Sequence, residues 1–235
     1  TRSTDFTYTD SSEDTCILTS YTGTDMTNLD SILENYGVKR SSGIVVETDS
    51  QHYYPQMPYY LLPNIGSDDI TTEVKSNYIL MPVAQAIQQL DSYRDTITIK
   101  SLLTTTEDAY IENDPENSTW SKSADSETGA FDLGVSITET VDDKETQIIY
   151  FSSASMLSSQ IDQAISGANS KLAATALTSM CDVEQTVVIP SKSTSYTNLV
   201  FTQGAVNTWS IITIAGIPLV LVVIGVMIWM KRRKQ

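Results

Sequence analysis

One stretch near the C-terminus limits what this chain can be more than any other part of its sequence. Residues 209–230 carry no charged side chain. Four basic residues follow directly: Lys231, Arg232, Arg233 and Lys234. A helix over 209–230 would span ~33 Å, enough for a bilayer core of ~30 Å. Short segments rich in Lys and Arg stay cytoplasmic, so we predict a single-pass protein of the cell membrane with its N-terminal domain extracytoplasmic and its C-terminus cytoplasmic.

Within the predicted membrane anchor, five residues have a recognisable place. Trp209 and Trp229 stand where an aromatic belt would hold the two interfaces of the lipid bilayer. Gly216, Pro218 and Gly225 have two interpretations. They mark a kink and a close contact with another membrane helix, or they are residues that a simple anchor tolerates.

The start of the chain bears on how an external domain is exported. The sequence begins at Thr1, and no apolar signal segment opens it. A domain followed only by a C-terminal anchor needs an upstream export signal. We therefore expect that this sequence is part of a longer protein, whose upstream part holds a signal or a second membrane helix.

The chain before the anchor is strongly acidic. Residues 1–208 hold all 29 acidic residues, whereas four of the 14 basic ones lie in the tail, and the formal net charge of the chain is −15. Such a surface repels phosphate backbones, so nucleic acid is not an expected partner. The acidic residues are dispersed and form no calcium-loop motif, which favours a solvated surface over a cation site.

The first part of the domain reads as strand, helix, strand. Short apolar runs at 16–18 and 44–46 predict strands. Between them, apolar residues recur at helical spacing: Leu29, Ile32, Leu33 and Tyr36. Thr27 is the predicted N-cap and Gly37 the left-handed residue that ends this helix. The order suggests a parallel α/β unit.

Further elements follow the same kind of pattern. We predict a short helix at 67–76, a polar loop at 111–130, and helices at 157–165 and 173–181. We predict strands at 78–83, 96–100 (leading into 102–106), 131–137 (one face wet), 148–151 (central) and 187–189. The chain then divides into an irregular lead-in (1–14), an extracytoplasmic α/β domain (15–190), a juxtamembrane linker (191–208), a transmembrane helix (209–230) and a basic tail (231–235).

The segment 51–63 is the best candidate for contact with a partner. It holds four tyrosines, Tyr53, Tyr54, Tyr59 and Tyr60, and three prolines, Pro55, Pro58 and Pro63. Tyrosine offers a large amphipathic contact area at low entropic cost, and prolines stiffen the loop. The alternative is that these rings cover the edge of the core.

The sequence offers little for catalysis. His52 is the only histidine and has no cue linking it to a nucleophile. Cys16 and Cys181 both lie in apolar settings, so buried free thiols are favoured over the alternative of one disulfide. No elbow, phosphate-loop or dinucleotide motif occurs. We predict no catalytic residue, no cofactor and no metal site.

Several loose motifs in a fixed order carry a family resemblance. They lie at 26–38, 43–47, 59–63, 102–106, 169–172 and 217–233. Over residues 16–235 the chain resembles the gliding-motility-type (Gld family) auxiliary proteins of bacterial ABC transporters. The resemblance implies a domain of the flavodoxin-like or class I glutamine-amidotransferase-like kind, a membrane helix at each end, and an ABC-2-type permease with its ATPase as partners. It carries over no catalytic residue.

Three functions follow from these observations. The first is a non-enzymatic accessory subunit of an ABC-type transport system, with the acidic domain beside the permease. The second is a free-standing extracytoplasmic domain that binds or senses a sugar, peptide or wall component. The third is an anchored hydrolase with unrecognised carboxylates; the first two predict no turnover.

Overall fold

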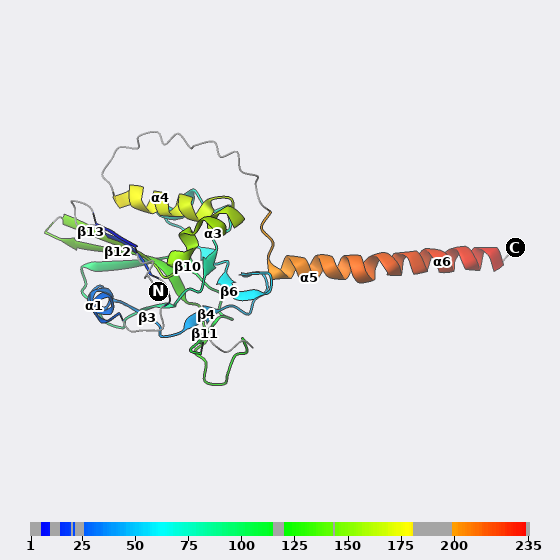
Figure 1. Ribbon diagram of the computed structural model, residues 1–235, viewed down its shortest axis with the longest axis horizontal. Coiled ribbons are helices and arrows are strands. Elements are labelled where there is room, and N and C mark those ends of the chain that lie inside the picture. Colours follow the sequence, from blue (N-terminus) through cyan, green and yellow to red (C-terminus); the bar gives the residue numbers. More distant parts are fainter. Residues whose placement is uncertain are drawn as a thin grey trace.

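The computed structural model describes residues 6–9, 15–19, 21, 26–114, 120–142, 144–180 and 199–233. They form a mixed α/β domain and a long apolar helix that points away from it (Figure 1). The C-terminal end of this helix is the point furthest from the domain. The broad prediction of a mixed α/β domain followed by one long apolar helix is therefore confirmed.

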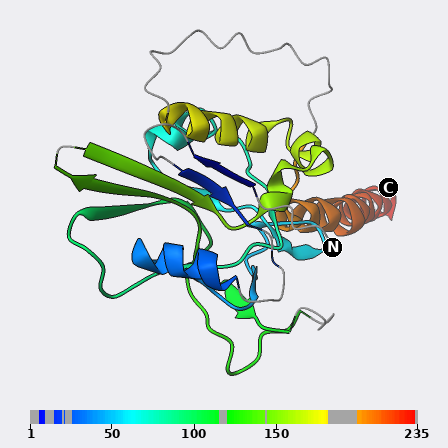
Figure 2. The same cartoon turned by 60° about the vertical axis from the view of Figure 1, so that its left-hand side comes forward.

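The largest sheet has eight strands and curls between two layers of helices (Figure 2). Its main path runs β1 (Phe6–Thr9), β2 (Thr15–Leu18), β13 (Lys144–Phe151), β12 (Asp132–Val141), β10 (Ile97–Thr104) and β7 (Asn64–Ile65). β9 (Ile87–Gln89) joins β12 and also pairs with β3 (Val38–Arg40). Among the described strands of this sheet, β13 and β2 pair in parallel and the other pairs are antiparallel.

Two small sheets complete the β structure. β4 (Ile44–Val46) pairs with β11 (Tyr110–Glu112), and β6 (Met57–Leu61) lies between β5 (Tyr53–Tyr54) and β8 (Met81–Pro82). The predicted parallel unit is therefore wrong, because β2 joins the main sheet while β4 pairs antiparallel with β11. All three β4 residues are buried, so their sequence gives no information about which strand they pair with. The flavodoxin-like arrangement is not confirmed by these pairings.

The central part of the main sheet is buried on both faces. Alternation along β13 sends Ile149 and Phe151 into one core and Ile148 and Tyr150 into the other. The first core is covered by η1 (Ala154–Leu157), α3 (Ser159–Ala164) and α4 (Ala168–Met180), together with α2 (Asp69–Thr72). The second core lies under α1 (Thr27–Asn35). The predicted wet face of 131–137 is wrong, because Ser136 is buried and accepts a hydrogen bond from Gln147 Nε2.

Helix α1 begins differently from the prediction. Met26 is the N-cap, its side chain makes no capping bond, and Thr27 is already helical. The Met26 amide instead donates to the Asp30 carboxylate at 3.2 Å. Leu33 is buried, whereas Ile32 is 49% exposed, so the predicted apolar stripe is narrower than expected. Gly37 ends the helix with φ +82°, as predicted.

Several predictions fall at or beyond the edges of the described residues. β1 lies within the predicted irregular lead-in and pairs with β2. Of the predicted strand 78–83, the residues Met81–Pro82 pair as β8. The strand at 187–189, Cys181, the first part of the linker (191–198) and Lys234 lie outside the described residues.

The C-terminal helix is continuous but not uniform. α5 (Gln203–Ile211) passes through a π-helical turn (Ile212–Gly216) into α6 (Ile217–Arg233). Pro218 follows this wider turn, where its missing N–H and its bulky ring are tolerated. Among the described residues, the helix from Gln203 to Arg233 is the one long and apolar enough to cross a membrane. It starts at Gln203, inside the predicted linker.

Candidate functional site

The first turn of the long helix is bonded directly to the domain. We call residues 202–204 the helix root. The Gly204 amide donates to the Ser50 carbonyl oxygen at 2.6 Å, and Thr202 Oγ1 donates to Gln51 Oε1 at 3.1 Å. The Gln56 amide donates to Gln203 Oε1 at 2.8 Å. The root is therefore held by the loop and hairpin at 50–56, at the start of the Tyr/Pro segment.

Two features make this attachment specific. Thr202 caps α5, since its side chain accepts a hydrogen bond from the Ala205 amide at 3.2 Å. Gly204 is buried, and a Cβ atom added there would overlap the side chain of Gln51. Any other residue at 204 must displace Gln51 or separate the root from the domain.

A buried carboxylate stabilises the loop that carries Ser50 and Gln51. Glu47 is 2% exposed. Its carboxylate accepts hydrogen bonds from the amides of Thr48, Asp49 and Thr106, at 2.8, 3.0 and 3.2 Å, and from the Thr106 hydroxyl at 2.9 Å. These four bonds offset the cost of burying the carboxylate and tie the loop to the end of β10.

A largely apolar cavity of about 610 Å³ lies beside the helix root. We call it the root groove. Its lining comes from β5, β6, β8, η1 and α3 and from their connections: Tyr54, Met57, Tyr60, Leu80, Pro82, Val83, Ala154, Ser155, Leu157, Ser158, Gln160, Ile161 and Ala164. None of these residues is charged. Such a volume and lining are typical of sites for small apolar ligands.

The four predicted contact tyrosines lie in three different environments. Tyr54 and Tyr60 line the root groove and pack against the first core. Tyr59 points to the opposite side of β6, where its ring lies 4.5 Å from that of Trp120. Burial and the carboxylates of Asp49 and Glu47 raise the pKa of Tyr53. The Tyr54 and Tyr60 rings are thus placed both to cover the core and to meet a ligand.

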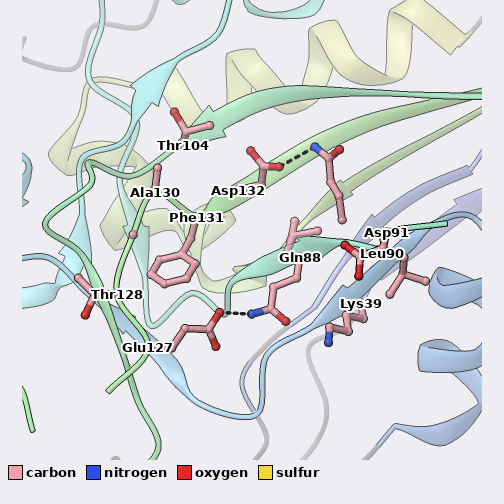
Figure 3. A pocket seen from close by; sticks show the side chains of 13 residues that line it. Lys39, Gln88, Leu90, Asp91, Thr104, Glu127, Thr128, Ala130, Phe131 and Asp132 are labelled. Carbon is pink, nitrogen blue, oxygen red and sulfur yellow. Dashed lines mark hydrogen bonds between the residues drawn. The ribbon is translucent and has the colours of Figure 1, made fainter. Parts of the chain in front are cut away.

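A second, polar cavity of about 580 Å³ lies between β3, β9 and the segment 127–132 (Figure 3). Gln88 Nε2 donates to Glu127 Oε1 at 2.6 Å, and Gln89 Nε2 donates to Asp132 Oδ2 at 3.1 Å. Lys39 brings an amine to the same cavity. The arrangement offers both donors and acceptors to a small polar ligand.

His52 and Cys16 have the side chains best suited to catalysis, and each is in contact with neighbouring parts of the fold. His52 Nδ1 lies 3.2 Å from the Leu62 carbonyl oxygen, and its Nε2 lies 3.9 Å from Asp49 Oδ2. Cys16 is buried in the first core, and burial raises the pKa of its thiol to about 11. A thiol in that state is a poor nucleophile at neutral pH. Within the described part of the chain, no three His, Cys, Asp or Glu residues converge as a metal site.

The tryptophans of the predicted anchor are exposed, and its glycines have open space beside them. Trp209 and Trp229 are 63% and 59% exposed. A Cβ atom added at Gly216 or Gly225 would meet nothing within 4 Å. The last turn carries Lys231, Arg232 and Arg233, and the Arg233 guanidinium lies 5.3 Å from the centre of the Trp229 ring.

Sequence reasoning identified the tyrosines but missed both the helix root and the two cavities. Lys39, Gln88 and Glu127 are ordinary surface residues in the sequence, and only the pairing of β3 with β9 brings the first two together. One local signal was present for the root. Thr202 followed by Gly204, before an apolar helical stretch, is typical of a helix start with close backbone contact.

Comparison with known proteins gives little to add to this geometry. No protein-family profile and no curated protein matches the chain. One solved structure with similarity is described as the "mmIFT52 N-terminal domain", with 14% sequence identity and a TM-score of 0.44. The match covers 67% of this chain and 60% of that one. So distant a similarity identifies neither a fold nor a function.

Proposed function

We propose that this protein is a non-enzymatic, membrane-anchored accessory subunit of an ABC-type transport system. Its acidic domain stands outside the cell membrane beside an ABC-2-type permease, and its C-terminus is cytoplasmic. The observation that supports this most is the continuous helix from Gln203 to Arg233, whose first turn is hydrogen-bonded to the domain. The ATPase subunit and the flavodoxin-like or amidotransferase-like kinship belong to the same proposal, and they come from the family resemblance.

The attachment at the root favours a positioning role. A free-standing receptor needs only a flexible linker between its domain and its membrane helix. Here the hydrogen bonds at Gln203 and Gly204 fix the height of the domain above the membrane and its orientation. Gln203 precedes Trp209 by ~9 Å along a helix. With Trp209 at the interface, the domain would stand close to the membrane surface, where a permease opens.

The apolar surface of the helix is exposed, which favours its being covered by lipid or by another protein. Leu219 and Leu221 are 65% and 63% exposed, and the part of the helix apolar enough to span a membrane is not buried by the domain. Gly216 and Gly225 each leave open space beside the helix backbone, on nearly opposite faces because they are about two and a half turns apart, so each allows close approach of a neighbouring helix. The basic residues after Met230 set the orientation.

A pull-down in mild detergent tests the proposal. The full chain with an affinity tag should recover an ATPase and a multi-helix permease. Replacing Gly216 and Gly225 with Leu should leave membrane insertion unchanged and abolish that recovery. The matched control is Val223→Leu, which changes volume in the same helix without filling a gap beside the backbone. Recovery of this protein alone from the wild-type chain would overturn the proposal.

The polar cavity favours a second candidate, an external domain that binds a small polar ligand such as a sugar or peptide. Gln88, Gln89 and Glu127 there present amides and a carboxylate to solvent. Saturable binding to the wild-type chain, lost on Gln88→Leu while the double glycine variant still binds, would support this role. Absence of any binding across sugar and peptide libraries would argue against it.

A further inference from the structure

The root groove stands out because it is free of charge in a very acidic protein. The chain has 29 acidic residues and a net charge of −15, yet none lines this cavity. Met57 and Leu157, both lining residues, are each 37% exposed. A charged ligand would find no ionic partner there, whereas an apolar one would remove these side chains from water.

The groove also lies at one end of the domain. α3 and β6 lie near the end from which α5 leaves, whereas the β12–β13 hairpin points to the opposite end (Figures 1 and 2). Gln56, next to Met57, is bonded to Gln203 at the helix root. Trp209 lies ~9 Å further along the helix, and a headgroup layer is roughly 5–8 Å thick. With the helix in a bilayer, Met57 is therefore at the outer surface of the headgroups.

We propose that the root groove binds one acyl chain of an uncharged or zwitterionic lipid drawn from the adjacent membrane leaflet. Leu80, Ile161 and Ala164 provide apolar contacts for the chain. The hydroxyls of Ser155 and Ser158 can donate hydrogen bonds to the ester carbonyl oxygens of the lipid. The inference depends on the proposed membrane anchoring and is independent of a transporter partner.

The size of the groove favours an acyl chain over a partner helix. A helix ~10 Å wide would fill a volume of this size within roughly one and a half turns. Helices that bind in grooves use side chains at i, i+3, i+4 and i+7, which need about two turns. The groove of about 610 Å³ is within the range of small-molecule sites, ~300–1,000 Å³.

Photo-crosslinking tests the proposal with the full chain in nanodiscs of phosphatidylcholine. A fraction of the lipid carries a diazirine on one acyl chain, and adducts are located by peptide mass spectrometry. We expect adducts within the membrane helix and also on residues of the root groove, such as Met57 and Leu157. The variant Ala164→Phe fills the groove and should reduce groove adducts about tenfold. This is the loss of affinity expected when roughly two methylene groups of the acyl chain are no longer buried.

The matched control is Ala174→Phe on the exposed face of α4, which should leave groove adducts unchanged. Because Ala164→Phe adds volume, circular dichroism should verify that it folds, and the exposed variant Met57→Gln provides a second test with a smaller loss. Adducts on the helix with none in the groove would overturn this inference and leave the transporter proposal intact. Groove adducts unaffected by Ala164→Phe would also overturn it. Absence of adducts on the helix would overturn the membrane anchoring itself.

Discussion

The same apolar residues occupy opposite environments in the two parts of this molecule. Leu102 in β10 is completely buried, whereas Leu219 in α6 is 65% exposed. The domain buries most of its core leucines and valines under its own sheet and helices. The long helix has no such cover within the described structure. Its apolar surface therefore has to be covered by lipid or by another protein.

The sharpest way to test this contrast is to remove the same atoms from both parts. Leu102→Ala leaves a cavity in the first core and should lower the free energy of unfolding by ~2–5 kcal/mol. Leu221→Ala should leave domain unfolding unchanged, because its side chain packs against no core cluster. Urea unfolding in detergent micelles, followed by far-ultraviolet circular dichroism, measures both. Equal losses would contradict a self-contained domain.

A smaller loss is expected from the loop that holds the helix root. Glu47→Ala leaves the amides of Thr48, Asp49 and Thr106 without their acceptor and should cost ~3 kcal/mol in unfolding free energy. Glu34→Ala on the exposed side of α1 is the control and should stay within about 0.5 kcal/mol of wild type. A Glu47→Ala protein as stable as the control would show that the four bonds do not stabilise this loop.

Substitutions at two glycines of the long helix test whether the domain holds the helix at Gly204. Gly204→Leu must displace Gln51, so hydrogen exchange at 50–56 should accelerate about tenfold, equivalent to ~1.4 kcal/mol of local stability. Gly225→Leu has open space around it and should leave that exchange unchanged. Unchanged exchange in both variants would mean that the root is not held by the domain.

The smallest expected effect is at the domain surface and depends on pH. The Arg94 guanidinium donates to Glu139 at 2.7 and 2.9 Å and, with a hydrogen bond from Thr96, holds the pKa of Glu139 below its ordinary value of 4.5. The ion pair therefore stabilises the fold at pH values above the ordinary pKa of Glu139. This contribution is lost as the pH falls through the lowered pKa. Arg94→Met should flatten the dependence of the urea midpoint on pH in this range. An unaltered dependence would show that the pair contributes nothing measurable.

The sequence predicted an element correctly where the residues that determine it lie close together along the chain. The central strand at 148–151 was recognisable as a continuous run of four apolar residues, all of them buried. The helix ended by Gly37 was recognisable by apolar residues at helical spacing. The pairing of β4 with β11 joins segments more than sixty residues apart, and a short strand buried throughout gives no sign of its partner.

The candidate site was harder to predict for the same reason. Tyr54 and Tyr60 stood out by composition, but their separation from Tyr59 follows from the strand that forms at 57–61. The helix root joins Ser50 to Gly204, and no local pattern connects two such distant residues. The apolar helix itself was the clearest signal, since it requires only an uninterrupted run of uncharged residues.

The most direct test of this account is the depth of two spin labels in phosphatidylcholine vesicles. Val220→Cys and Met57→Cys are labelled in a chain whose Cys16 and Cys181 are replaced by Ala, and relaxation by oxygen and by an aqueous nickel complex gives the depth of each label. We expect the label at residue 220 to lie deep in the hydrocarbon, reached by oxygen and shielded from nickel, and the label at residue 57 to lie at the outer surface of the headgroups. A label at 220 as accessible to nickel as one on the aqueous surface at Glu127 would contradict this account.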